Sequence, residues 1–194
     1  MTEIEEIHRT KILNQLHRVT ISENMLLRAT IIGQKLYEIH NKNRTTQPVF
    51  HTGNPEQDEV KGVLGELCIC DYAYKNNLTY EYNPVYDGKG DKVDITIEDE
   101  QCAIKTAKMK NLLSKTNWSS WNFLVERTQL DKETRNHIDQ IISIQISKNW
   151  KQAFIMGMIT PLEVKRAPIR TDILKPAYAV QYDWLHDVQD IKEC

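Results

Sequence analysis

The sequence predicts a domain of the α+β class, a small mixed sheet flanked by helices, and two observations lead to this prediction. Apolar residues recur at helical spacing through most of the first 75 residues, and short β-rich runs dominate afterwards. A length of 194 residues, with 40% hydrophobic and 27% charged residues, suits one globular domain. We therefore expect residues 1–194 to form a single domain.

The N-terminal part is expected to be helical. Apolar residues recur every three or four positions between Ile4 and Leu16, and the same rhythm continues after Ser22, which is a candidate N-cap. These patterns predict a helical accessory segment over residues 1–42. So short a segment can hardly bury a core of its own, and no separate domain is expected there.

The next helix carries clear start signals after a polar loop. Asn54 is a typical N-cap, Pro55 suits the first helical position, and Glu56 places an acid in the first turn. The expected helix continues to about Lys75 and ends at Asn76-Asn77. Beyond it, short runs of β-forming residues predict strands at 78–83, 92–98, 101–107, 140–147, 152–160 and 177–182.

The segment from Val93 to Lys105 is expected to form a hairpin with polar chemistry on one face. A turn at Asp99-Glu100 would set Asp94 directly opposite Lys105, with the apolar residues on the other face. A simple cross-strand ion pair on a solvated face has the same pattern. A functional site is favoured by Glu66, because an idle carboxylate between apolar helix residues is costly to bury.

In this order the residues resemble the PD-(D/E)XK nuclease superfamily, which has the restriction-endonuclease-like fold. The matching features are Gly65-Glu66 on a helix, Asp94 after a glycine-containing turn, and Ile104-Lys105-Thr106 on the next strand. The resemblance covers residues 55–107 at the level of motifs. It implies a nuclease-like core over residues 55–182.

The resemblance implies a metal-dependent deoxyribonuclease that uses Mg²⁺, or Mn²⁺ as a substitute. Glu66 and Asp94 would be catalytic carboxylates and metal ligands, and Lys105 the catalytic lysine. The main-chain carbonyl of Ile104 would add one more oxygen ligand of the kind that Mg²⁺ prefers. The superfamily usually has Glu, Asp or Gln two residues before the lysine, where this sequence has Ala103. Either Glu66 has taken over that role, or the site is inactive.

The chain offers a candidate surface for nucleic acid beside these residues. Lys108, Lys110 and Lys115 follow Lys105 with no acid between them, which indicates either contacts to DNA phosphates or a solvated basic loop. No apolar run reaches the roughly 20 residues of a membrane span, and the acidic N-terminus lacks a hydrophobic leader. The sequence therefore predicts a cytoplasmic protein that does not enter a membrane.

Three functions compete at this point. The leading one is a Mg²⁺-dependent DNA endonuclease of the restriction type or the phage and mobile-element type. It would act as a homodimer or as the cleavage subunit of a heterodimeric enzyme, since one active site cuts one strand. The second is a non-catalytic nucleic-acid or protein-binding module with a degenerate nuclease site. The third is an α+β interaction protein with an incidental ion pair.

Overall fold

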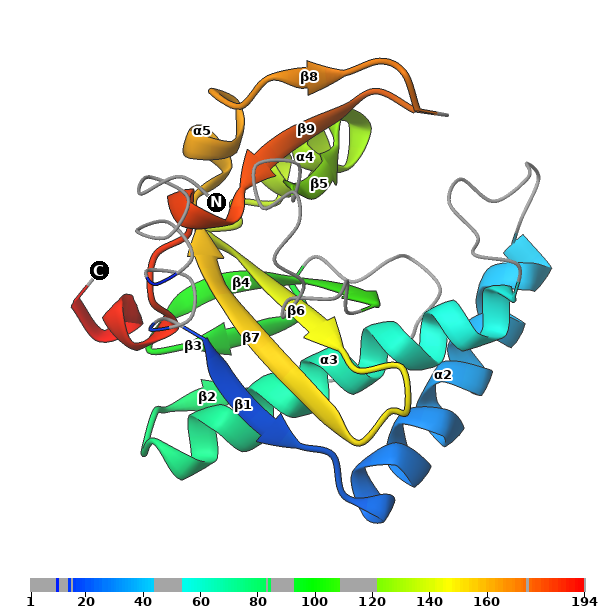
Figure 1. Cartoon of the computed structure of the whole chain (residues 1–194). Helices are drawn as coiled ribbons and strands as arrows, with labels where there is room; N and C mark the ends of the chain where they lie inside the picture. Colours follow the sequence, from blue (N-terminus) through cyan, green and yellow to red (C-terminus); the bar gives the residue numbers. More distant parts are fainter. Residues whose placement is uncertain are drawn as a thin grey trace.

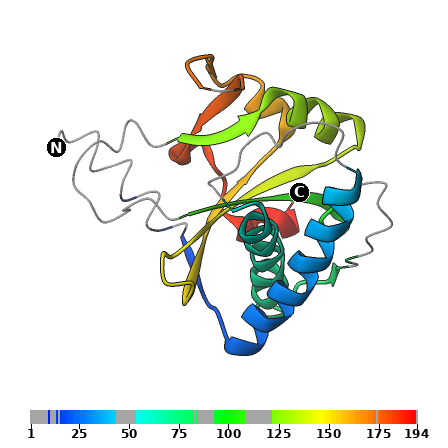
Figure 2. The same ribbon diagram turned by 90° about the vertical axis from the view of Figure 1, so that its right-hand side faces the viewer.

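The computed structural model describes residues 16–43, 54–82, 84, 93–108, 122–173 and 175–193, together with Thr10 and Asn14. A six-stranded sheet forms the centre of the fold, with two long helices on one side of it (Figure 1). A three-stranded sheet and two shorter α-helices lie on the other side, as the rotated view makes clear (Figure 2). The fold is therefore of the α+β class, as the sequence predicts.

The central sheet has the strand order β1-β7-β6-β4-β3-β2. Its strands are β1 (His17–Thr20), β2 (Tyr80–Glu81), β3 (Ile95–Ile97), β4 (Glu100–Lys108), β6 (Gln140–Ile146) and β7 (Gln152–Ile159). All neighbouring pairs are antiparallel except β4 and β6, which are parallel. A parallel pair needs a crossover connection, and this one contains β5 (Asn122–Glu126) and α4 (Arg127–Arg135).

The smaller sheet has the order β5-β9-β8 and covers the face of the central sheet away from the long helices. It is completed by β8 (Ile169–Arg170) and β9 (Ala177–Gln181), next to the short helix α5 (Pro161–Val164) and the 3₁₀ helix η2 (Tyr182–Trp184). The C-terminal 3₁₀ helix η3 (Val188–Glu193) instead packs, through Val188 and Ile191, in the core cluster that contains α3. Buried residues from both sheets, including Ala103 and Val125, form one apolar cluster between them. The central sheet is thus packed on both faces.

The two long helices begin where the sequence predicts. Helix α2 (Glu23–Asn43) follows Ser22, whose hydroxyl accepts a hydrogen bond from the Met25 amide at 3.1 Å. Helix α3 (Pro55–Lys75) follows Asn54, whose side chain accepts from the Gln57 amide at 3.2 Å. These caps satisfy amides that have no partner within the helix. No helix among the described residues is long and apolar enough to cross a membrane.

The expectation of helix throughout residues 1–42 is wrong at residues 17–20. This segment is strand β1, which pairs with β7 at the edge of the central sheet. Its single buried side chain, Val19, is β-branched and joins the larger core cluster together with Ala29 and Leu36 of α2. The described part of the supposed accessory segment therefore contributes to the core.

Helix α3 approaches β4 most closely at Gly65. A Cβ atom on Gly65 would lie 2.0 Å from Oγ1 and 3.1 Å from both carbon atoms of the Thr106 side chain, Cβ and Cγ2. Rotation of the Thr106 side chain would move Oγ1 away, but the tight 3.1 Å contact with the Thr106 Cβ would remain, because that atom does not move. A Cβ atom on Gly62, by contrast, would have no atom within 4 Å. The glycine before Glu66 is therefore required for the close packing of α3 on the sheet.

This contrast gives a matched pair of substitutions on one helix. Gly65→Ala should lower the free energy of unfolding by about 1–3 kcal/mol, because the helix must move away from β4. Gly62→Ala should raise it by up to about 1 kcal/mol, because alanine favours helix and the space is open. Denaturant-induced unfolding of both variants measures this, and equal effects would contradict the close approach at Gly65.

Candidate active site at the start of strand β3

The hairpin between β3 and β4 has a different turn from the one expected. Ile97 pairs with Glu100, so the two turn residues are Glu98 and Asp99, whose φ angles are 48° and 69°. Positive φ at both positions is the backbone of a tight two-residue hairpin turn. The predicted turn at Asp99-Glu100 is therefore wrong by one residue.

The corrected turn shifts the strand register by two residues. Ile95 pairs with Cys102, and Asp94, which lies just before β3, donates its amide to the Cys102 carbonyl at 3.2 Å, so Asp94 does not lie directly opposite Lys105. A shift of two keeps every side chain on its face, so the alternation of apolar residues cannot reveal it. The prediction that Asp94 lies directly opposite Lys105 is therefore wrong, and Asp94 itself precedes the paired residues of β3.

The Asp94 carboxylate continues the hydrogen bonding of β4 just before the first residue of β3. Its Oδ2 accepts a hydrogen bond from the backbone amide of Ile104 at 2.6 Å. Because the N–H and C=O of one strand residue point to the same edge, the Ile104 carbonyl is directed to the side of the strand where Asp94 lies. The carboxylate and this carbonyl thus bring two kinds of oxygen donor to one edge of β4.

Lys105 forms an ion pair with Glu133, a residue that the sequence pattern does not indicate. Its Nζ donates to Oε1 of Glu133 on α4 at 2.7 Å, and the side chains of Lys105 and Glu133 are only 16% and 9% exposed. A cavity of about 350 Å³ lies beside Lys105, with Glu126 and Gln129 also in its wall. The ion pair fixes the ammonium group next to this cavity.

Glu66 is half-buried on α3 and is oriented by an aromatic partner. The Tyr82 hydroxyl, just after β2, donates to its Oε2 at 2.9 Å. Tyr82 follows the edge strand β2, whose neighbour in the sheet is β3, the strand that Asp94 precedes. The phenol therefore holds the Glu66 carboxylate toward this end of the sheet.

The oxygen donors can be compared with the needs of Mg²⁺. In the part of the chain that the structure describes, no three His, Cys, Asp or Glu residues form a group that could hold a metal ion. Mg²⁺, however, is often bound by one or two carboxylates and keeps several waters. Asp94, Glu66 and the Ile104 carbonyl are hard oxygen donors of this kind, so the chemistry of the set fits Mg²⁺.

Ala103 occupies the position where the resemblance leads one to expect a carboxylate or Gln. Its side chain is 2% exposed and belongs to the apolar cluster between the two sheets, which also contains Val125 and Leu130. A carboxylate among these apolar side chains would lose its hydration without compensation. The packing on this face thus gives a physical reason for alanine.

The expected basic surface falls mostly outside the described residues. Lys110 and Lys115 lie there entirely, and of Lys108 only the backbone, at the end of β4, is described.

Comparisons with known proteins add little to this site. No family model matches the chain, and no solved structure matches it. A segment of 109 residues is 28% identical to human cadherin-12. The aligned segment makes up 56% of this chain and 14% of cadherin-12. The chain thus spans about one seventh of the length of this relative, and the similarity does not place it in a family.

The ion pair between Lys105 and Glu133 should be important for stability. Glu133→Gln should lower the free energy of unfolding by about 1–3 kcal/mol, because a largely buried ammonium loses its counter-charge. The double variant Lys105→Met/Glu133→Leu should regain most of this loss, since an apolar pair often replaces a buried ion pair well. Denaturant-induced unfolding measures both.

The exposed pair Arg170–Asp172, with an N–O distance of 2.6 Å, is the control. Asp172→Asn should leave the unfolding midpoint almost unchanged, because solvent screens this pair. A Glu133→Gln variant as stable as the Asp172→Asn variant would contradict the buried pair.

Proposed function

We propose that this protein is a Mg²⁺-dependent DNA endonuclease with a restriction-endonuclease-like core, of the restriction type or the phage and mobile-element type. The observation that carries the proposal is the 2.6 Å hydrogen bond from the Ile104 amide to Asp94. It sets a carboxylate beside the strand edge to which the Ile104 carbonyl is directed, one residue before Lys105. A small mixed sheet flanked by helices, which the resemblance implies, agrees with this reading.

Each residue has a distinct task in this proposal. Asp94, Glu66 and the Ile104 carbonyl would bind Mg²⁺, which when bound supplies a Lewis acid and an activated water. The Lys105 ammonium would stabilise the negative charge that develops on the phosphate in the transition state. Glu133 would act as a positioning residue, because it holds this ammonium at 2.7 Å. Tyr82 would position Glu66 in the same way.

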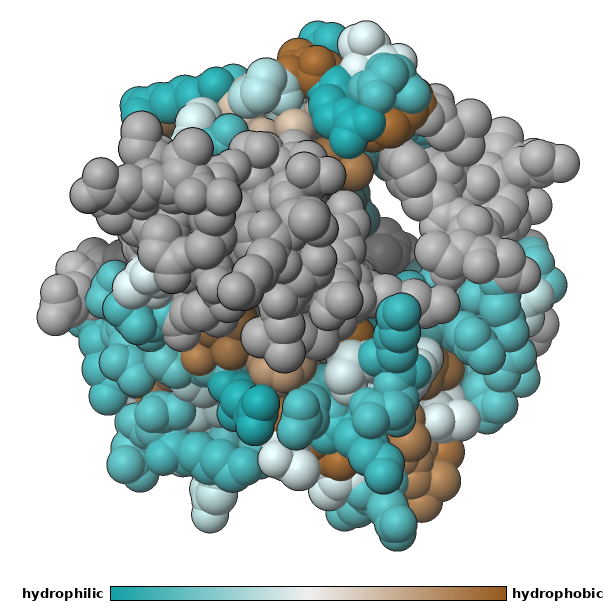
Figure 3. Space-filling view, in the orientation of Figure 1, coloured by the Kyte–Doolittle hydropathy of each residue, from teal (hydrophilic) through white to brown (hydrophobic). Residues whose placement is uncertain are grey.

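The proposal includes a second subunit, because cleavage of both DNA strands needs two active sites. The protein would act as a homodimer or with a partner subunit. Leu27 and Ile31, one helical turn apart on α2, are 58% and 47% exposed, and apolar side chains reach the surface over this helix (Figure 3). These residues support a protein contact on the outer face of α2.

The runner-up function is a non-catalytic nucleic-acid or protein-binding module with a degenerate nuclease site. The observation that favours it is the buried alanine two residues before Lys105, since Ala103 supplies no side-chain ligand. Metal-dependent cleavage distinguishes the two functions, because the runner-up binds its partner and cuts nothing.

Asp94→Asn is the sharpest test of the proposed chemistry. The amide oxygen of Asn can still accept from the Ile104 amide, so the fold should persist while the charge that binds the cation is lost. We expect nicking of supercoiled plasmid DNA with Mg²⁺ to fall by on the order of 100-fold or more. The assay follows conversion of supercoiled to open-circular and linear DNA.

Asp99→Asn is the matched control, because Asp99 is an exposed turn residue of the same hairpin with a positive φ that Asn tolerates. It should cut at the normal rate. An Asp94→Asn variant that nicks plasmid as fast as Asp99→Asn would refute the assignment of Asp94.

A further inference from the structure

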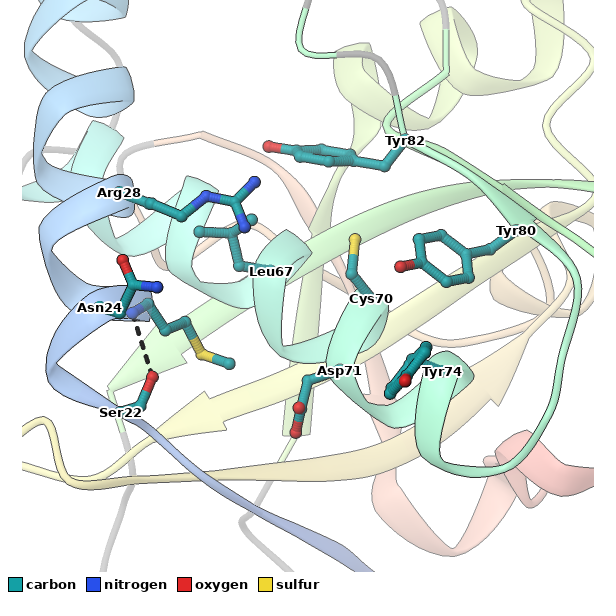
Figure 4. Close-up of a pocket in the computed structure, with 10 residues that line it drawn as sticks. Ser22, Asn24, Arg28, Leu67, Cys70, Asp71, Tyr74, Tyr80 and Tyr82 are labelled. Atoms are coloured by element: carbon teal, nitrogen blue, oxygen red, sulfur yellow. Dashed lines mark hydrogen bonds between the residues drawn. The ribbon is translucent and has the colours of Figure 1, made fainter.

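A second cavity, of about 410 Å³, lies between the start of α2, the C-terminal half of α3 and strand β2 (Figure 4). The residues that give it its chemical character are Arg28, Cys70, Asp71, Tyr74, Tyr80 and Tyr82. Tyr82 also donates a hydrogen bond to Glu66, so it belongs to the candidate active site as well. The cavity therefore adjoins that site through one shared side chain.

The wall of the cavity is rich in exposed aromatic surface. Tyr74 is 73% exposed and Tyr80 is 36% exposed, although large aromatic side chains gain most from burial. Figure 4 shows both rings on the side of the cavity away from α2, with Tyr82 above them. Among the described residues, neither the Tyr74 hydroxyl nor the Tyr80 hydroxyl has a side-chain hydrogen-bond partner. Such rings are surfaces on which a planar base can stack.

The guanidinium of Arg28 lies across the cavity from these tyrosine rings (Figure 4). Arg28 extends from α2 toward Cys70 at the centre of the cavity (Figure 4), and it forms no ion pair with any residue that the structure describes. The nearby carboxylate of Asp71 is already paired with Lys75 at 2.6 Å. Among the lining residues that the structure describes, the charge without a partner is thus a guanidinium, which suits the geometry of a phosphate.

The floor of the cavity is apolar. Leu67 is 4% exposed, and burial, together with the nearby Glu66 carboxylate, raises the pKa of the Cys70 thiol to about 12. The thiol therefore stays protonated at neutral pH and behaves as a small apolar group and not as a nucleophile. The cavity combines an apolar floor, aromatic walls and a guanidinium that pairs with no described carboxylate.

We propose that this cavity binds an unpaired nucleotide of a DNA strand, with its base against Tyr74 and Tyr80 and its phosphate at Arg28. The inference rests on the proposed nuclease function and narrows the substrate class to DNA with an unpaired or opened strand next to the cleaved bond. Tyr82 connects the two sites, because the phenol that lines the cavity also orients Glu66. A fully paired duplex offers no unstacked base to the tyrosines.

The test uses the full chain in the presence of EDTA, so that binding is measured without cleavage. Fluorescence anisotropy compares a labelled single-stranded 12-mer of mixed sequence with its blunt duplex. We expect the single strand to bind about 10-fold or more tightly than the duplex. Tyr74→Leu/Tyr80→Leu should weaken single-strand binding by about 10- to 100-fold, because base stacking is lost. Arg28→Gln should weaken it and reduce the dependence of affinity on salt by about one ion.

Two exposed residues on the other side of the central sheet serve as matched controls, Trp184 and Arg166. Trp184→Leu and Arg166→Gln should leave single-strand binding unchanged. Tyrosine variants that bind the single strand like the wild type would overturn the proposal. Competition by thymidine monophosphate as strong as that by the unlabelled 12-mer would also overturn it, because the cavity would then be a site for a small molecule and not for a DNA strand.

The strand-binding experiment and the nicking assay can fail independently of each other. Tyrosine-dependent binding of the single strand without Mg²⁺-dependent nicking supports this cavity and rejects the nuclease function. Mg²⁺-dependent nicking that is lost in Asp94→Asn, together with unchanged binding by the tyrosine variant, supports the nuclease function and rejects the cavity.

Discussion

The hydrogen bond from the Ile104 amide to the Asp94 carboxylate is the contact on which the candidate site depends. Ile104 is buried, with 8% of its surface exposed. Without the Asp94 carboxylate, its backbone amide would lose this hydrogen-bond partner, because Asp94 lies just before the first residue of β3. A buried amide without a partner costs free energy, so folding itself holds the carboxylate at this edge. The same bond orients Asp94 beside the strand edge to which the Ile104 carbonyl is directed. The hydrogen bond between the Ile104 amide and Asp94 Oδ2 therefore contributes both to the stability of the hairpin and to the orientation of the candidate metal ligand.

Helix α3 connects this edge to the second cavity. Gly65 lets the helix lie against Thr106 of β4, which brings the next residue, Glu66, to the level of the site. Cys70 and Tyr74 follow at intervals of four residues along the same helix, so they share a face with Glu66. One helix face thus carries a candidate metal ligand and the floor and wall of the neighbouring cavity, and Tyr82 lies against both.

The sequence predicts those features that depend on local patterns. Helix α3 begins where Asn54 and Pro55 indicate, and a strand overlaps each of the six predicted runs. Strand β1 is missed because four residues with one buried side chain are too few to interrupt a helical rhythm. The hairpin register is missed because a shift of two preserves both faces. Glu133 is missed because its partner lies 28 residues away, and no local spacing relates the two.

The central claim is that Asp94 and the Ile104 carbonyl share one divalent cation, and a crystal structure grown with Mn²⁺ tests it most directly. The anomalous signal of Mn²⁺ locates the ion without reference to activity. The account predicts a peak at about 2.1 Å from a carboxylate oxygen of Asp94 and from the Ile104 carbonyl, with Glu66 bound directly or through water. Crystals saturated with Mn²⁺ that show no peak at Asp94 would contradict it.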